Sequence, residues 1–259
     1  MIMVRKRGLL VVAALIMVLA IASVSQAFEL GLRGYYWFPY FRGDVKVDKD
    51  TLVGTEINAK DMMEVGNKGY PALEAYGGIG KHHLSLMYTY LGHSKDNLLT
   101  ANVNFAGKTF TAGTSVESDL TLRVLDLEYQ YDIFKFKPIL AGFTLGVLGK
   151  LKYLDGETSM TSAATGKMKE TFSTVVPMVG VGAHLGLLAN LLEARAKVTG
   201  MGYSGNLYID ALADISLTPF PFVDIHAGYR IMKVKMDNVD NFTNDFFFAG
   251  PYLGLTVGF

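Results

Sequence analysis

FFFAGPYLGLTVGF, residues 246–259, is the stretch that decides the fold. Its odd positions, from Phe247 to Phe259, are all apolar, whereas its even positions carry aromatic rings, glycines and one threonine. This alternation predicts a β-strand with two different faces. The strand ends on an aromatic residue without a polar tail, unlike the frayed ends of most soluble proteins. A closed barrel in lipid needs such a strand, because it has an apolar outer wall, a small or polar interior and a last strand that pairs with its first.

The first 27 residues fit a secretory signal peptide. Three basic residues at positions 5–7 precede an apolar run over residues 9–21, and Ser25-Gln26-Ala27 offers a small-x-small cleavage site. The apolar run is too short for a comfortable transmembrane helix. We therefore predict cleavage near Ala27, which leaves residues 28–259 as one barrel domain, and an uncleaved N-terminal anchor is the alternative.

Composition narrows the class of protein further. Lys and Arg number 24, as do Asp and Glu, so cleavage of the basic signal peptide would leave a slightly acidic chain, and we expect no nucleic-acid partner. The chain has no cysteine, which excludes a cysteine-linked lipid anchor, disulfides and thiolate metal sites. It also lacks a glycine-rich phosphate loop and any His/Asp/Glu run with metal-ligand spacing, so we expect no cofactor and no metal.

Nine further segments alternate in the same way as the last strand. They are residues 28–38, 70–80, 83–91, 118–131 and 138–153, a segment that ends in residues 175–185, and residues 192–201, 206–217 and 222–235. The predicted fold is all-β, a closed antiparallel up-and-down transmembrane β-barrel of ten strands. Eight or twelve strands would follow if a hairpin has been merged or split.

The connections between these segments alternate between short turns and long polar stretches. The long ones cover residues 39–68, 92–117, 154–169 and 236–245, and the short connection after residues 192–201 is an exception to the alternation. The second long one contains a possible protruding hairpin, VNFAGKTF, at 103–110. The phase of the segment 118–131 slips, because its apolar positions are even up to Val124 and odd afterwards. We interpret the slip as a bulge near Val124 or as an upper half that lies outside the bilayer.

With its signal peptide, alternating strands, unequal loops and terminal Phe259, the chain resembles small bacterial outer-membrane β-barrel proteins of the OmpA/OmpW-like kind. The resemblance implies an outer-membrane location, both termini in the periplasm, and contact with outer-membrane lipid and lipopolysaccharide. It also implies that the barrel-insertion machinery reads Leu255, Val257 and Phe259 as an assembly signal. The resemblance indicates no extracellular ligand. A soluble lipocalin-like barrel or β-sandwich is the alternative fold, but its polar face would be richer in charge.

The predicted inward face carries charges of both signs. The residues predicted to form a lumen charge network are Glu29, Arg33, Glu74, Lys150, Lys152, Glu193, Arg195, Lys197, Asp210, Asp214, Asp224, His226 and Arg230, and Asp126, Glu128, His83 and His184 share the same face. A turn at 218–221 would pair Asp210 with Arg230 and Asp214 with His226, and the short connection between residues 201 and 206 would bring Lys197 near Asp210. Nearly balanced charges in a narrow barrel predict a plugged lumen, and a narrow or gated channel is the alternative.

Two sets of residues superficially resemble catalytic groups. Asp214, Ser216, Asp224 and His226 could cluster like a Ser-His-Asp set, and His83 and Ser85 have His-x-Ser spacing. Both sets point into the lumen, where a histidine is more often a hydrogen-bonded filler, so we expect no enzymatic activity. The sequence therefore predicts a structural or surface-interaction barrel whose long loops 39–68 and 92–117 form the contact surface, with a small-solute channel as the alternative.

Overall fold

The computed structural model describes residues 28–47, 54–58, 68–136, 141–188, 191–239 and 242–258, so the predicted signal peptide and Phe259 lie outside the described residues. The strands are β1 (Phe28–Trp37), β2 (Tyr40–Val47), β3 (Ile57–Asn58), β4 (Tyr70–Ile79), β5 (His82–Leu98), β6 (Val103–Phe105), β7 (Lys108–Phe110), β8 (Ser115–Phe136), β9 (Ala141–Ser162), β10 (Gly166–Leu187), β11 (Leu192–Tyr203), β12 (Asn206–Phe220), β13 (Val223–Val239) and β14 (Phe242–Gly258). The described part of the chain contains no helix that is long and apolar enough to cross a membrane.

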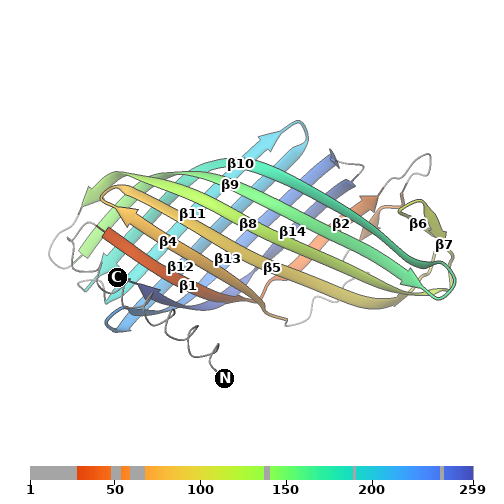
Figure 1. Ribbon diagram of the computed structural model, residues 1–259, viewed down its shortest axis with the longest axis horizontal. Helices are drawn as coiled ribbons and strands as arrows, with labels where there is room; N and C mark the ends of the chain where they lie inside the picture. The colour runs from red at the N-terminus through yellow and green to blue at the C-terminus, as the bar shows by residue number, and fades with distance from the viewer. Residues whose placement is uncertain are drawn as a thin grey trace, which may run out of the picture.

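Ten of these strands form a closed antiparallel barrel (Figure 1). From β4 to β14 the barrel strands pair in chain order, with β5 next to β8 because β6 and β7 form a separate hairpin, and β1 closes the ring by pairing with both β4 and β14. Leu32 faces Val257 across the closing pair. The closed ten-stranded barrel predicted from the alternation is therefore confirmed.

The strand β2 continues β1 after a break at Phe38 and Pro39. The closing strand β14 spans this break, because its last residues pair with β1 and its first residues pair with β2. The backbone N–H of Phe38 donates to the carbonyl of Pro251 at 2.9 Å, which holds the two halves together. Pro39 thus lies where the hydrogen-bond ladder is already interrupted, so its missing N–H removes no regular hydrogen bond between strands.

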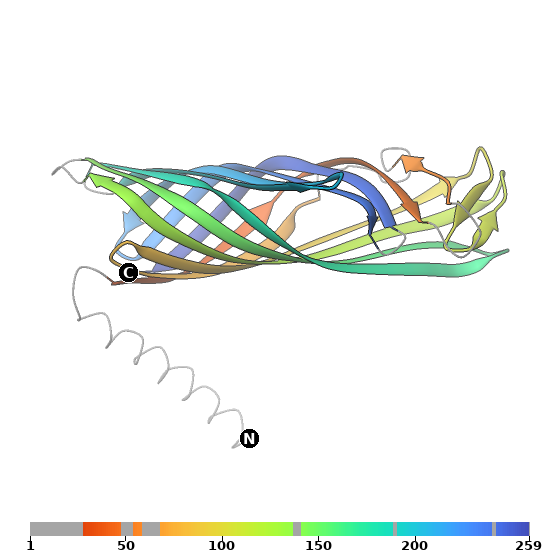
Figure 2. The ribbon, with the colours of Figure 1, turned by 90° about the horizontal axis from the view of Figure 1, so that it is seen from above.

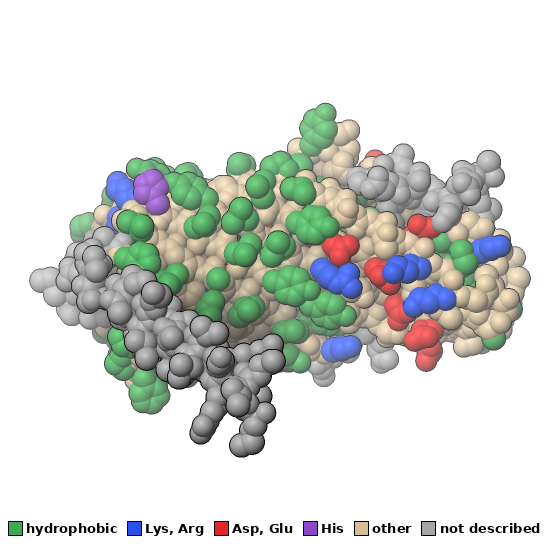
Figure 3. Space-filling model, in the orientation of Figure 1, with side chains coloured by type: hydrophobic (Ala, Val, Ile, Leu, Met, Phe, Trp, Pro, Cys, Tyr) green, Lys and Arg blue, Asp and Glu red, His purple; other side chains and the backbone are tan. Residues whose placement is uncertain are grey.

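The outer wall of the barrel is apolar. On β14, Leu253, Leu255 and Val257 are 59%, 56% and 60% exposed, whereas the inward-facing Tyr252 and Thr256 are buried. Figure 3 shows hydrophobic side chains spread over most of the visible barrel wall, with most of the charged side chains gathered toward one end. A closed sheet whose exposed face is a continuous apolar belt spans a lipid bilayer, because every backbone group inside the belt is paired.

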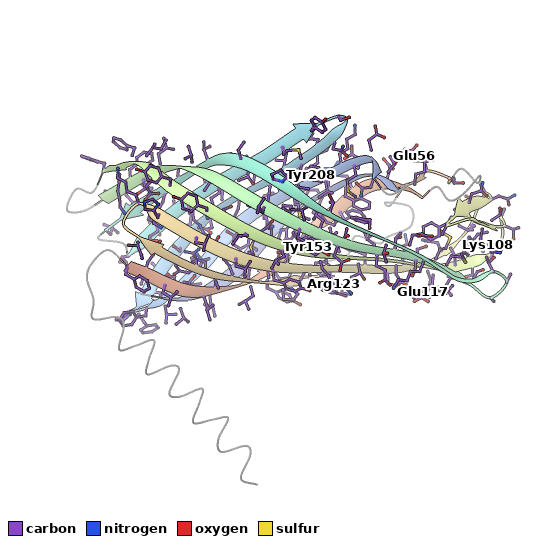
Figure 4. All side chains as sticks on the ribbon, turned by 45° about the horizontal axis from the view of Figure 1, so that its top comes forward. Glu56, Lys108, Glu117, Arg123, Tyr153 and Tyr208 are labelled. Carbon is purple, nitrogen blue, oxygen red and sulfur yellow. The ribbon has the colours of Figure 1, made fainter. Side chains whose placement is uncertain are left out.

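The belt ends before the strands do. On β9 the outward positions change from Leu151 and Tyr153 to Asp155, which pairs with Arg123 of β8 at 3.0 Å. In Figure 4, Arg123 lies close to Tyr153 at the start of this extension, and Glu117 lies farther along it. Figures 1 and 2 show β5, β8, β9 and β10 continuing past the other strands at this end, opposite the end where the C-terminus lies. Tyrosines at the border and ion pairs beyond it mark the membrane–water interface.

The phase slip in the segment 118–131 has a simple cause in the structure. The strand β8 runs without a register shift from Glu117 to Asp132, so the predicted bulge near Val124 is wrong. Leu120, Leu122 and Val124 point inward and are buried above the belt, whereas the odd positions from Leu125 onward face lipid. The alternative interpretation, an upper half outside the bilayer, describes the strand correctly.

The loop end is more ordered than the sequence suggests. The predicted loop 154–169 is mostly strand, because β9 and β10 pair as far as Ser162 and Gly166. The predicted hairpin is confirmed as β6 and β7, which pair from Val103 to Phe110. This hairpin contacts the first long loop, since Thr55 N–H donates to the carbonyl of Asn104 at 3.0 Å and Asn104 N–H donates to Thr55 Oγ1 at 2.9 Å.

Candidate functional site

A buried ionic cluster blocks the middle of the lumen. Its members, here called the central network, are Asp126, Glu128, Lys150, Lys152, Lys197, Asp210 and Arg230, and all are buried or nearly so. Asp210 is the hub, because it pairs with Arg230 at 2.9 Å, Lys152 at 2.8 Å and Lys150 at 3.6 Å. Three carboxylates thus face four cations, and such a cluster is stable only because each group is paired.

The remaining contacts of the central network reach across the barrel. Lys152 donates to Asp126 at 2.9 Å, and Lys197 donates to Glu128 at 2.6 Å. Arg230 also donates to Thr89 Oγ1 at 3.0 Å, and its guanidinium lies 5.1 Å from the centre of the Trp37 ring. Because the pairs join β8, β9, β11, β12 and β13, the cluster spans the lumen instead of lining one wall.

A second charged layer lies nearer the end that carries the C-terminus. Arg33 pairs with Glu74 at 3.1 Å, and Arg195 pairs with Asp214 at 2.6 Å. Two tyrosines connect these pairs. Tyr35 donates to Glu74 at 2.9 Å and accepts from Arg195 at 3.0 Å, and Tyr252 donates to Asp214 at 2.6 Å. Between this layer and the central network is a space of about 30 Å³, which is room for about one water molecule.

On the loop side of the central network the lumen is filled by rings. The group, here called the aromatic plug, consists of Trp37, Phe41, Tyr70, His93, Phe246 and Phe248. Phe41 stacks on Phe248 with ring centres 4.6 Å apart, and His93 lies 5.1 Å from Tyr70 and 5.4 Å from Phe41. The outward positions of β5 are apolar only as far as Tyr90, so His93 lies beyond the membrane-spanning segment, and its burial among the rings lowers its pKa to about 4.

The other end of the lumen is open as a chamber of about 610 Å³. Glu29, Glu193, Asp224 and His226, which were predicted as members of the charge network, line this chamber instead of joining the buried clusters. Short turns surround its mouth, and in outer-membrane barrels the short turns and both termini are periplasmic. The lumen is therefore a chamber that is open at the end with the short turns and closed at its inner end.

The predicted partners of individual charges were partly wrong. In the structure Leu212, not Asp210, faces Arg230, and Ser216, not Asp214, faces His226. The shift of two residues arises because β12 continues to Phe220, with an irregular register, before it turns. Asp210 still meets Arg230 diagonally, but Asp214 binds Arg195 and Tyr252, and Lys197 binds Glu128 in place of the predicted Asp210.

The catalytic-like groups are engaged in other contacts. His226 Nε2 hydrogen bonds to Thr256 Oγ1 at 2.5 Å, and Asp224 accepts from Thr218 at 2.7 Å. Both ring nitrogens of His83 lie against carboxylates, those of Glu29 and Asp132. Within the described ranges no Ser-His-Asp relay is formed by these hydrogen bonds, and no group of three or more His, Asp or Glu residues could hold a metal ion.

Some residues that organise the lumen had no clear signal in the sequence. Tyr35 and Tyr252 have the inward phase, but aromatic residues in a barrel strand usually indicate the interfacial belt. Asp132 lies just beyond the predicted segment 118–131, in the connection to the next segment, whereas in the structure it is a buried residue of β8. Of the predicted assembly signal, Leu255 and Val257 face outward, and Phe259 lies outside the described residues.

The closed sheet, the apolar outer wall and the filled lumen define the class: this chain has the fold of small bacterial outer-membrane β-barrel proteins. No protein-family model matches the chain, and no curated protein sequence matches it.

Among solved structures, the outer membrane protease OmpT from Escherichia coli is similar with 8% identity and a TM-score of 0.43, over 91% of this chain and 98% of that one. The attachment invasion locus protein Ail of Yersinia pestis matches with 10% identity and a TM-score of 0.33, over 91% and 100% of the two chains. The toluene transporter TodX of Pseudomonas putida matches with 8% identity and a TM-score of 0.25, over 92% and 91%. These three proteins have different roles, so the class rests on the geometry of this chain.

Proposed function

We propose that this protein is a structural or surface-interaction barrel of the outer membrane whose lumen does not conduct. The observation that carries the proposal is that three filled layers follow one another along the lumen. They are the layer of Arg33, Glu74, Arg195 and Asp214, then the central network, and then the aromatic plug. A wide ion pathway would instead present an excess of one charge along an open constriction.

The contact surface in this proposal is the loop end. The β6–β7 hairpin and the described part of the first long loop are joined by two backbone-mediated hydrogen bonds between Thr55 and Asn104. Phe105 and Phe110 are buried beneath the hairpin, so it has a fixed position on the barrel. An ordered extracellular hairpin can present side chains to a partner with little loss of conformational entropy.

Several expectations about assembly and partners belong to the same proposal. The signal peptide would be cleaved near Ala27, the belt would contact outer-membrane lipid and lipopolysaccharide, and the insertion machinery would read the strand that carries Leu255 and Val257. We further propose that the protein is not an enzyme, which is supported by the existing partners of His83, Asp214 and His226.

A narrow or gated channel is the second candidate, and the chamber favours it. About 610 Å³ of open lumen leads from the periplasmic mouth to the buried layers, so displacement of a few ion pairs could extend the path.

Conductance of the refolded mature protein in a planar bilayer distinguishes the two functions. If the lumen is closed, neither the wild type nor Lys197→Ala should show a steady conductance. A steady conductance that changes in Lys197→Ala would establish the channel.

Deletion of residues 101–112, which removes the hairpin, should leave insertion intact and abolish any binding to host or bacterial surface molecules.

A further inference from the structure

The periplasmic chamber has the size of a ligand site and a closed end. Its volume of about 610 Å³ lies within the range of small-molecule pockets, roughly 300–1,000 Å³. The inner end is closed by Arg33, Arg195 and Lys197, which all line it. A solute that enters the chamber from its open end would therefore meet this closed inner end.

Charge is distributed unevenly between the two ends of this chamber. Each cation at the inner end already has a carboxylate partner: Arg33 has Glu74, Arg195 has Asp214 and Lys197 has Glu128. This end is therefore close to neutral.

The mouth carries carboxylates whose partners are histidines or a hydroxyl group instead of Lys or Arg. Glu29 pairs with His83, Glu193 pairs with His184 at 3.1 Å, and Asp224 accepts from the Thr218 hydroxyl at 2.7 Å. Across the described part of the chain, no Lys or Arg lies within ion-pairing distance of these three carboxylates. Asp132 and Lys135 also line the chamber and pair with each other at 3.8 Å, so they leave the balance unchanged. The mouth thus has an excess of negative charge in a confined space with low-dielectric walls, which attracts cations more strongly than an open surface does.

A buried polar atom in the same wall lacks a partner. His226 is only 4% exposed and lines the chamber, and its Nδ1 forms no hydrogen bond. In the tautomer whose Nε2–H donates to Thr256 Oγ1, Nδ1 is an acceptor without a hydrogen-bond donor. Asp224, two residues away on β13, points into the same chamber, so one N–H-rich group could donate to both.

We propose that the chamber binds small organic cations that carry primary ammonium groups, with Asp224, Glu193 and His226 as the recognition groups. An ammonium group supplies three donors and a positive charge, which satisfies the His226 acceptor and the uncompensated carboxylates together. The cation could be a free polyamine or a lysine-rich peptide segment. The site is independent of the proposed closed lumen, because binding requires only the chamber.

Isothermal titration calorimetry of the refolded mature protein in detergent micelles tests this proposal. One arm uses spermidine and the other uses tri-lysine amide, both in 50 mM salt. Saturable binding of spermidine alone assigns the site to free polyamines, and binding of the peptide alone assigns it to basic segments. No saturable binding of either probe would overturn the proposal.

Matched variants locate the binding. Asp224→Asn, Glu193→Gln and His226→Phe should each raise Kd by tenfold or more, and circular dichroism verifies folding. Asp155→Asn and Glu157→Gln make the same charge changes on the outward face of β9, away from the chamber, and should leave Kd within twofold. If Kd rises equally in both groups of variants, the cation is attracted unspecifically by the charge of the whole protein. Mg²⁺ that competes at equal concentration would mean a general cation site, and either result refutes recognition by the ammonium group.

Discussion

The charge balance of the central network leads to an asymmetric prediction for two neighbouring residues. Asp210 pairs with three cations, so Asp210→Asn leaves two carboxylates facing four cations in a buried space. Removal of one partner from a buried ion pair costs about 3–5 kcal/mol, and the hub position of Asp210 puts this substitution at the upper end. Arg230→Met, by contrast, leaves three carboxylates facing three cations, and Lys152 still pairs with both Asp126 and Asp210. We expect about 2 kcal/mol for this change, mostly from the lost hydrogen bonds.

Urea unfolding in detergent micelles measures this difference. Trp37 is the only tryptophan and is buried beside Arg230, so its fluorescence reports on the lumen, and far-UV circular dichroism provides a probe that does not depend on the mutated contact. Asp155→Asn removes a carboxylate from an ion pair on the outer surface and should change stability little. If Arg230→Met destabilises the barrel as much as Asp210→Asn does, the charge-balance reasoning is refuted.

Three further substitutions test other parts of the barrel. Phe41→Ala empties the centre of the aromatic plug and should cost about 3–5 kcal/mol by urea unfolding, and a cost below about 1 kcal/mol would mean that the rings are loosely packed. Leu253→Arg places a charge in the lipid-facing belt and should cost about 2–4 kcal/mol in vesicles, whereas Leu253→Ala should not, and a tolerated arginine would contradict the assigned belt. Burial lowers the pKa of His93 to about 4, so below about pH 6.5 the unfolded chain takes up its proton first. The stability from neutral His93 is complete above that pH and falls between about pH 6.5 and 4, by at most about 3 kcal/mol. The urea midpoint should fall less over this interval in His93→Phe than in the wild type, and equal falls would exclude His93 as the cause.

The sequence could predict the wall of the barrel because lipid and lumen impose opposite demands on alternate residues. Leu253, Leu255 and Val257 follow this rule along the whole of their strand. Outside the bilayer the outward face becomes polar and the inward face can be apolar. For this reason the inward-facing Leu122 appeared to break the phase of β8, although the strand is regular there.

Partners inside the lumen were harder to predict, because they depend on the stagger between strands and on contacts across the barrel. Lys197 and Glu128 are 69 residues apart and come from strands that do not pair with each other. Alternation places both side chains inward, but it carries no information on which inward residues meet. The pairing of Asp210 with Arg230 could be approached only because their strands are joined by a short turn.

The closing strand also bears on how the protein reaches its native state. Gly31 faces Gly258, so the contacts that complete the ring join its first strand to its last, more than 200 residues apart in the sequence. Contacts of such high sequence separation form late, since the loop entropy must be lost before they contribute. Until β14 docks on β1 and β2, those two strands and β13 present unpaired edges that can join other chains. Chains in which the barrel has not yet closed are therefore the species most exposed to aggregation and proteolysis.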